Sequence, residues 1–359
     1  MQARESDPRL FLTIFVAALL LSLAAIWLYV VYMPMRFLET GYVSWTAKMD
    51  LAKTCDMGDL VVIGDSQAEA AINPLGLSVK STNLAVGGAT PIEMYYWGEH
   101  VLRCPNVPRH VMLTMARGQM GLISNFLFEN GARYGYIGFG PLQEIQTESA
   151  RLHDGALERL HTRDGLNGTL RNAFYAMHAP PLYFNSLISA RFNGRAQANT
   201  QVYDRLLRNR GHNDYPGQVQ NAGAGAHAEE PDFKVLPIQA YYLERLIERL
   251  EGAGAQVHFL VMPRRGSGDE QHAGQQDARF NAYLVGLQRQ HPHFDVVNGV
   301  PAIWPDALFS DAAHLNPAGT ERYTAQFEHC VKLRVLAGPA APAAACDFTS
   351  VVAGNSLAN

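Results

Sequence analysis

The sequence predicts an α/β fold: a largely parallel β-sheet covered by helices on both faces and preceded by an apolar N-terminal helix. Short apolar runs rich in β-branched residues alternate with longer helical patterns along the chain. Helices of that length are the crossover connections that parallel strands require. The chain also opens with an uncharged run over residues 10–32, long enough to cross a hydrocarbon core of roughly 30 Å as a helix.

The N-terminal apolar run, LFLTIFVAALLLSLAAIWLYVVY, predicts an uncleaved signal anchor. A cleaved signal peptide has a shorter apolar region followed by a small-x-small site, and the MPMRF sequence after this run offers no such site. Arg4 and Arg9 precede the run and Arg36 follows it, a small bias towards a cytoplasmic N-terminus. We therefore expect a single-pass membrane protein.

Four cysteines, Cys55, Cys104, Cys330 and Cys346, lack the CxxC spacing of a zinc site. Two disulfides formed in an oxidising compartment would account for the even number. Cys55 and Cys104 each lie just before a predicted strand, so we favour that pair, with Cys330 and Cys346 closing the C-terminal end. The other pairings, and four reduced thiols in a cytoplasmic protein, stay open as alternatives.

The predicted elements alternate along the chain. Strand-like runs cover residues 59–64, 81–86, 109–115, 255–263 and 294–299. Helical patterns cover residues 37–57, 66–77, 90–103, 235–254, about 275–290 and 316–336. The alternation breaks down between about residues 118 and 234, where short helical patches and glycine-rich turns stand instead.

Three regions follow from this pattern. Residues 1–36 hold the N-terminal tail and the anchor, residues 37–336 the α/β domain, and residues 337–359 an Ala/Pro-rich tail. A structureless loop as long as the insertion at 118–234 is uncommon, so we expect packed elements there. The net charge is only -4 and no long basic run is present, which argues against nucleic-acid binding.

Residues typical of a serine hydrolase gather where the predicted strands end, which is where parallel α/β sheets place their reactive groups. Ser66 follows the first strand in the sequence GDSQ, and Asp311 and His314 stand three residues apart before the last helix. His314 can serve as general base towards Ser66, and Asp311 can orient the imidazole. Gly88 ends the second strand, so its N–H and that of Ser66 can form an oxyanion hole.

Several of these residues also have structural interpretations. Ser66 can be no more than a helix N-cap, and Asp65 is expected to stabilise the turn rather than to react. The GGATP turn lacks the lysine and the spacing of a phosphate loop. His291 and His293 lie in a Pro-containing turn without a metal-ligand pattern, so we expect a solvated loop there rather than metal ligands. We therefore expect neither a cofactor nor a metal.

Three motifs and their order resemble those of the SGNH (GDSL-type) hydrolase superfamily. They are GDS, the glycine of NLAVGGATP, and DAAHLNP. The resemblance covers the whole α/β core and implies a flavodoxin-like three-layer α/β/α sandwich with an acyl-Ser66 intermediate. The superfamily's third block supplies an asparagine as a further oxyanion donor, whereas this chain has MLTMARGQMG there. Arg117 and Gln119 are the polar candidates for that place, Asn125 lies farther on, and Gln67 is a candidate substrate contact.

This departure, together with the anchor, resembles the membrane-anchored polysaccharide-modifying branch, similar to the alginate and bacterial cellulose acetylation proteins and the D-alanylation protein of teichoic acids. The resemblance implies a bacterial inner-membrane protein with a periplasmic domain that adds or removes O-acetyl groups on a polysaccharide. Its implied partner is a membrane-bound acyltransferase or a polysaccharide synthase. Two alternatives remain: a non-catalytic SGNH-fold scaffold or glycan-binding subunit, and a small-lipid esterase with a deeper apolar pocket.

Overall fold

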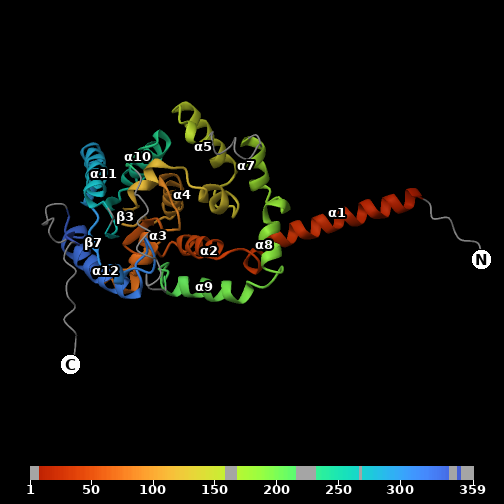
Figure 1. Ribbon diagram of the computed structural model, residues 1–359, viewed down its shortest axis with the longest axis horizontal. Helices are drawn as coiled ribbons and strands as arrows, with labels where there is room; N and C mark the ends of the chain where they lie inside the picture. The colour runs from red at the N-terminus through yellow and green to blue at the C-terminus, as the bar shows by residue number, and fades with distance from the viewer. Residues whose placement is uncertain (1–7, 158–167, 216–231, 267–268, 339–345, 349–359) are drawn as a thin grey trace, which may run out of the picture.

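The computed structural model describes residues 8–157, 168–215, 232–266, 269–338 and 346–348 (Figure 1). Parts of the predicted regions lie outside the described residues: 1–7 of the N-terminal tail, 158–167 and 216–231 of the insertion, and all of the C-terminal tail except 337, 338 and 346–348.

The centre of the protein is a sheet of parallel strands: β1 (Leu60–Gly64), β2 (Ser81–Asn83), β3 (His110–Thr114), β4 (Gln256–Leu260) and β6 (Phe294–Asn298). Their order is β2-β1-β3-β4-β6, and each pairing is parallel. The predicted α/β fold with a parallel sheet is confirmed. Because β2 and β3 flank β1 on opposite sides, the carboxyl ends of β1 and β3 border the crevice where such sheets bind ligands.

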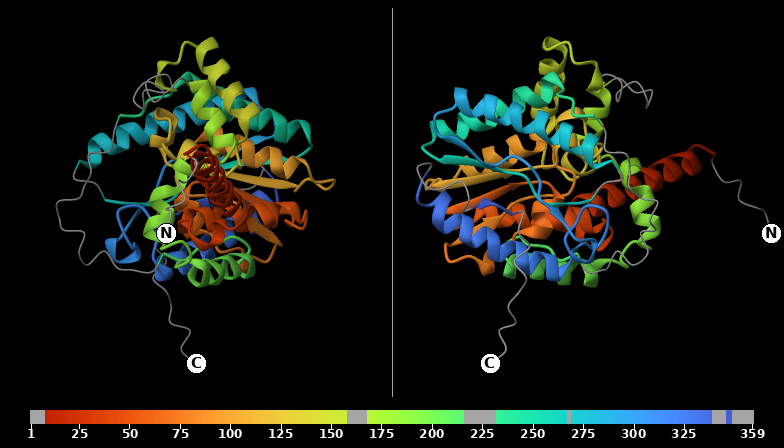
Figure 2. Two further views of the ribbon diagram at one scale, coloured as in Figure 1. Left: turned by 90° about the vertical axis from the view of Figure 1, so that its right-hand side faces the viewer. Right: turned by 60° about the vertical axis from the view of Figure 1, so that its left-hand side comes forward.

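Helices cover both faces of this sheet (Figure 2). Helices α4 (Pro91–Leu102), α10 (Pro237–Gly252) and α11 (Glu270–Gln290) pack on one face, and α3 (Ser66–Ala71) and α12 (Pro317–Cys330) on the other. Side chains of a strand alternate between faces, so in β1 Val61 and Ile63 join the first apolar cluster while Leu60 and Val62 join the second. A short pair, β5 (Arg264–Arg265) and β7 (Ile303–Trp304), lies outside this sheet.

The described part of the insertion is helical. It contains the short turns η3 (Arg117–Gly121), η4 (Leu127–Ala132) and η5 (Pro180–Tyr183), and the helices α5 (Phe139–Arg151), α7 (Gly168–Ala176), α8 (Phe184–Ser189) and α9 (Ala196–Arg208). Helix α9 packs along α2 (Thr40–Lys53), which itself joins the apolar cluster of the α4 face. The chain after α9 then returns to the edge of the sheet, where the backbone N–H of Asn83 donates to the carbonyl of Arg210 over 2.9 Å.

Helix α1 (Pro8–Tyr32) projects from the main body (Figure 1). Among the described residues it is the helix that is long and apolar enough to cross a membrane. Only its last turns touch the rest of the protein. There Val30 is 2% exposed and packs in a small cluster with Phe37, Tyr183 and Leu187.

Two disulfides join Cys55 to Cys104 and Cys330 to Cys346, the pairing that the sequence favoured. The second attaches the described part of the C-terminal tail to α12. Phe348 follows it, 2% exposed, and its carbonyl accepts a hydrogen bond from Trp304 Nε1 over 2.9 Å.

Candidate active site

Ser66 is the first residue of α3 and directly follows the turn that ends β1. Its Oγ lies 2.7 Å from Nε2 of His314, although the two residues stand 248 positions apart in the chain. Ser66 is partly exposed, so its hydroxyl is accessible to a substrate. The helix cap is a different residue: the carboxylate of Asp65 accepts the N–H of Gln67 over 3.0 Å.

One loop between η7 (Asp306–Leu308) and α12 presents both Asp311 and His314. His314 Nδ1 lies 2.7 Å from Oδ2 and 3.0 Å from Oδ1 of Asp311. The same carboxylate accepts the backbone N–H groups of Ala313 (2.8 Å) and His314 (2.9 Å). Partial burial raises the pKa of Asp311, but these hydrogen bonds outweigh it and hold the pKa below its ordinary value.

This geometry assigns the histidine tautomer. An ionised carboxylate accepts hydrogen bonds only, so Nδ1 of His314 carries the proton that Asp311 binds. Nε2 is then left as an acceptor for the hydroxyl proton of Ser66. The chain of contacts from Asp311 through His314 to Ser66 is therefore arranged as in a catalytic triad.

Asp65 is a structural residue of this site. It is 1% exposed, and its second oxygen accepts the N–H of Ala116 over 2.8 Å. Burial raises its pKa, while the hydrogen bonds from Ala116 and Gln67 oppose that rise. The side chain thus ties the end of β1 to the chain leaving β3, which fixes the turn that carries Ser66.

The expected oxyanion residue Gly88 lies past β2 with a φ of 69°, a backbone conformation that favours glycine. The N–H of Val86 still donates to the carbonyl of Gly64 over 2.9 Å, so this segment runs beside the end of β1 where Ser66 begins. A Cβ on Gly88 would meet the ring of Phe126 at 2.0 Å. The structure therefore tolerates only glycine here without movement of Phe126.

The three other polar candidates are placed differently. Gln67, the residue after Ser66, lines a pocket of about 220 Å³ together with Arg117, Met262 and Phe280. Arg117 was a candidate oxyanion donor, but it is 8% exposed and its guanidinium donates to the buried carboxylate of Asp277. Its role is therefore that of an ion-pair residue in the pocket wall. Gln119 is half-buried in η3.

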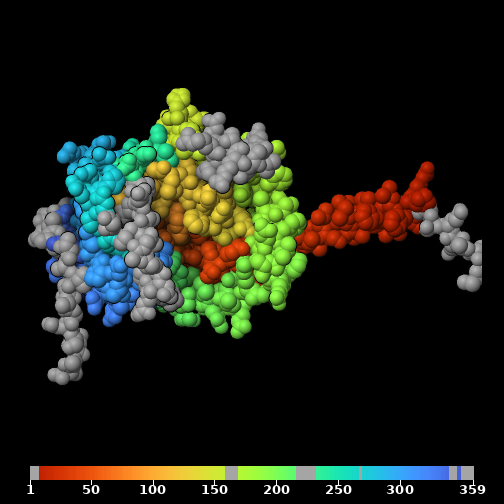
Figure 3. Space-filling view, viewed as in Figure 1, coloured from red at the N-terminus to blue at the C-terminus, as the bar shows by residue number. Residues whose placement is uncertain are grey.

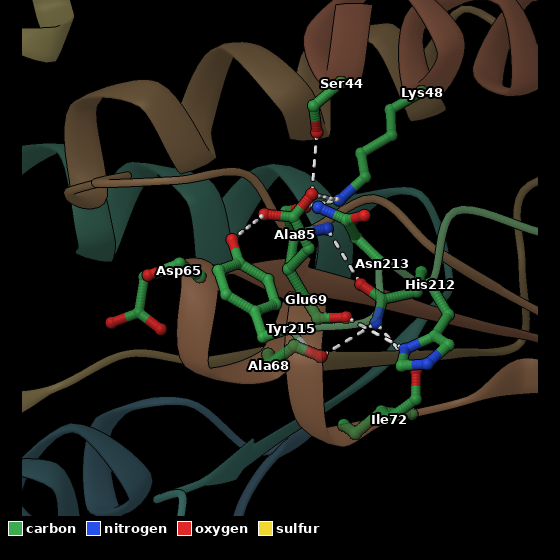
Figure 4. Close-up of polar contacts among 12 residues, drawn as sticks. Ser44, Lys48, Asp65, Ala68, Glu69, Ile72, Ala85, His212, Asn213 and Tyr215 are labelled. Carbon is green, nitrogen blue, oxygen red and sulfur yellow. Dashed lines mark hydrogen bonds and ion pairs between the residues drawn. The ribbon is translucent and has the colours of Figure 1, made fainter. Parts of the chain in front are cut away.

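A buried network around Glu69 was not predicted from the sequence (Figure 4). The ring of Tyr215 stacks on the imidazole of His314, with centroids 4.3 Å apart and planes 15° from parallel. Its hydroxyl donates to Oε2 of Glu69 over 3.1 Å. Burial and the neighbouring Glu69 raise the pKa of Tyr215, so the hydroxyl remains protonated and available as a donor.

Glu69 joins this network to helix α2. Its Oε1 accepts from Ser44 Oγ over 2.7 Å and lies 2.9 Å from Nζ of Lys48 (Figure 4). Lys48 is completely buried, and Nζ also donates to the carbonyl of Ala85. Burial lowers the pKa of Lys48, and Glu69 opposes this effect. The pair thus attaches α2, which follows the apolar N-terminal helix, to α3, which begins with Ser66.

The segment that carries Tyr215 is fixed by close backbone contacts. Gly211 has a φ of 93°, and a Cβ there would lie 1.9 Å from the carbonyl oxygen of Asn83. Farther along, the N–H of Asn213 donates to the backbone carbonyl of Glu69 over 3.3 Å. The local sequence GHNDY contains a turn-forming glycine, but nothing in it indicates that Tyr215 meets His314.

His258, in the middle of β4, is 4% exposed and pairs with Nδ1 of His110 on β3 over 3.1 Å. Burial and the neighbouring His110 lower its pKa to about 4. His291 is buried against Glu251 rather than solvated. Within the described residues, no group of three or more His, Cys, Asp or Glu side chains is placed to hold a metal ion.

Comparisons of the chain with protein-family models, with curated proteins and with solved structures returned no match.

Proposed function

We propose that the protein is a membrane-anchored, periplasmic serine acyltransferase or esterase of the SGNH type that adds or removes O-acetyl groups on an extracellular polysaccharide. The observation that carries this proposal is the hydrogen-bonded chain of Ser66, His314 and Asp311 at the carboxyl end of the parallel sheet. A serine hydroxyl is a weak nucleophile unless a base removes its proton, and His314 Nε2 is in contact with it.

In the first step, Ser66 Oγ attacks the acyl carbonyl while His314 Nε2 takes the hydroxyl proton. Asp311 stabilises the imidazolium that forms. The N–H groups of Ser66 and Gly88 would hold the developing oxyanion. The leaving alcohol departs with the proton from His314, which leaves an acyl-Ser66. In the second step, a sugar hydroxyl or water gives its proton to His314, attacks the acyl carbon and releases Ser66.

Other features support the substrate class and the location. The apolar helix α1 suits an anchor, and the two disulfides suit an oxidising compartment. The pocket beside Gln67, at about 220 Å³, is smaller than the roughly 300–1,000 Å³ typical of small-molecule sites. A short acyl group fits within that volume.

The test uses the full-length protein in nanodiscs, as wild type and as Ser66→Ala. The matched control is Ser78→Ala, because Ser78 is an exposed serine that follows α3 in the chain. Each is incubated with an activated acetyl ester and with short neutral β-linked or uronic-acid oligosaccharides, and products are followed by mass spectrometry. If wild type and Ser78→Ala form acetylated sugar and Ser66→Ala does not, the protein is a transferase. If wild type and Ser78→Ala release free acetate without acetylating a sugar, it is an esterase. Equal product from wild type and Ser66→Ala would reject the triad and favour the scaffold.

Tyr215 is expected to act as a positioning residue, because its ring rests on the imidazole of His314. Tyr215→Phe keeps the ring and loses the hydroxyl that donates to Glu69, so its kcat should remain near that of wild type. Tyr215→Leu removes the flat surface that orients the imidazole, and kcat should fall about tenfold with KM unchanged. A tenfold loss corresponds to an increase of about 1.4 kcal/mol in the activation free energy. Ester hydrolysis at saturating and limiting substrate separates the two constants. Equal kcat for the Phe and Leu variants would contradict this role.

A further inference from the structure

We propose that the segment formed by α7, η5, α8 and Phe192 is a second membrane contact, seated in the surface of the same bilayer that α1 spans. The proposal rests on the membrane anchoring proposed above, but not on the chemistry of the triad. Residues 168–192 of this segment are called the lipid-facing segment below.

The large apolar side chains exposed on the lipid-facing segment recur at helical spacing, with exposed Thr169, Asn185 and Ser189 beside them. On α7 they are Leu170 (54% exposed) and Phe174 (40%), followed directly after the helix by Met177 (56%), and on α8 they are Phe184 (41%) and Ile188 (70%). Positions three or four apart lie on one face of a helix. Each helix therefore turns an apolar face outwards.

The inward faces of the same helices carry polar side chains. On α7 the buried residues are Arg171 and Asn172, and on α8 Ser186 is buried beside Leu187. A helix that faces water shows the opposite arrangement, with its apolar stripe towards the core. On α7, this inversion supports an outer surface that does not face water alone.

The charge pattern supports the same conclusion. Residues 172–190, NAFYAMHAPPLYFNSLISA, contain no Asp, Glu, Lys or Arg, and Arg191 follows them directly. Arg191 is exposed, at the border of the apolar surface, where basic side chains meet lipid headgroups in interfacial segments.

Helix α1 sets the depth of the segment. Trp27 Nε1 donates to the carbonyl of Met177 over 2.9 Å, and the hydroxyl of Tyr29 donates to the carbonyl of Phe192. Trp27 lies five residues before Tyr32, the end of α1, which is about 8 Å along the helix axis at 1.5 Å per residue. Interfacial helices bury their apolar faces about 5–10 Å into the headgroup and acyl boundary. A helix bound to α1 at Trp27 is held within that zone.

The arrangement in space agrees with a bilayer as the occupant. Figure 3 shows the yellow-green atoms of the insertion forming the end of the body from which α1 leaves, and Figure 2 shows α1 leaving beside the same helices. A protein partner on this face would have to share it with the lipid that surrounds α1. We therefore assign the surface to lipid, and a second copy of the chain becomes an outcome of the test.

The test places single nitroxide labels on the full-length protein in vesicles of phosphatidylethanolamine and phosphatidylglycerol. Because the four native cysteines are paired, an added cysteine is the reactive thiol. The labels are Phe174→Cys and Ile188→Cys in the segment, Leu20→Cys in α1 and Leu75→Cys as the control; all four side chains are exposed. Electron paramagnetic resonance then compares collisions with oxygen, which concentrates in lipid, and with a nickel chelate confined to water.

We expect the labels at 174 and 188 to collide more with oxygen than with the nickel chelate, as the label at 20 does and the label at 75 does not. If the labels at 174 and 188 behave like that at 75 while 20 is in lipid, the anchor stands and the second contact is refuted. Protection of 174 and 188 from both reagents would mean a protein contact and would also refute it. A label at 20 open to the nickel chelate would refute the anchoring and this proposal together.

Discussion

His314→Ala is expected to lower kcat/KM for an activated acetyl ester by roughly 10⁴- to 10⁶-fold, the range found when a triad histidine or a triad carboxylate is removed from a serine protease. The reason is geometric. Nε2 of His314 lies 2.7 Å from Ser66 Oγ, so this imidazole can take the hydroxyl proton directly. Steady-state hydrolysis by the full-length protein in nanodiscs measures the effect.

The double variant Ser66→Ala/His314→Ala tests whether the two residues act as a unit. Residues of one triad are grossly non-additive, so the double variant should be no slower than the slower single one. His329→Ala, an exposed histidine on α12, is the matched control and should keep full activity. Losses that multiply in the double variant would show that Ser66 and His314 act independently, against the proposed mechanism.

Lys48→Met is expected to reduce the free energy of unfolding by about 3–5 kcal/mol, because removing one partner of a buried ion pair leaves the other charge uncompensated. Lys48 is 0% and Glu69 2% exposed, with Nζ and Oε1 2.9 Å apart. Urea unfolding followed by circular dichroism in detergent measures the change. The matched control is Lys53→Met in the same helix, whose pair with Asp50 is exposed and should matter by less than about 1 kcal/mol.

A second substitution separates charge from packing. In Lys48→Met/Glu69→Gln the buried negative charge is gone. Ser44 and Tyr215 bind different oxygens of Glu69, so the amide oxygen can accept from one of these hydroxyls while the amide NH2 donates to the other. Much of the lost stability should therefore return. If the double variant is less stable than Lys48→Met alone, the loss in the single variant comes from packing of the lysine stem and not from an unpaired carboxylate.

The parts of the site that could be predicted from the sequence are those built by adjacent residues. A strand ending in GDS must expose Ser66 at the sheet edge, and a DxxH spacing lets one loop present Asp311 and His314. Likewise, β1, β3 and β4 follow from their apolar runs. The second strand ends at Asn83 rather than at residue 86, although Leu84 and Val86 still donate backbone hydrogen bonds to β1.

The remainder depends on which faces of distant elements meet, and periodicity does not carry that information. Tyr215 reaches His314 because the chain after α9 returns along the sheet edge. Arg117 pairs with Asp277, which stands 160 positions away. Lys48 is a charged residue in a helix and is expected to face solvent; it is buried because Glu69, on another helix, compensates its charge.

The residues directly after helix α1 are hydrogen-bonded and packed rather than forming a flexible linker. The N–H of Met33 donates to the carbonyl of Tyr29, that of Leu38 donates to Pro34, and Phe37 is fully buried. A domain on a flexible linker samples many heights and orientations relative to its helix, whereas these contacts fix the α/β domain relative to α1. Under the proposed function, Ser66 would meet acyl donors and glycan chains at one fixed height, and the geometry of delivery would be part of the protein's specificity.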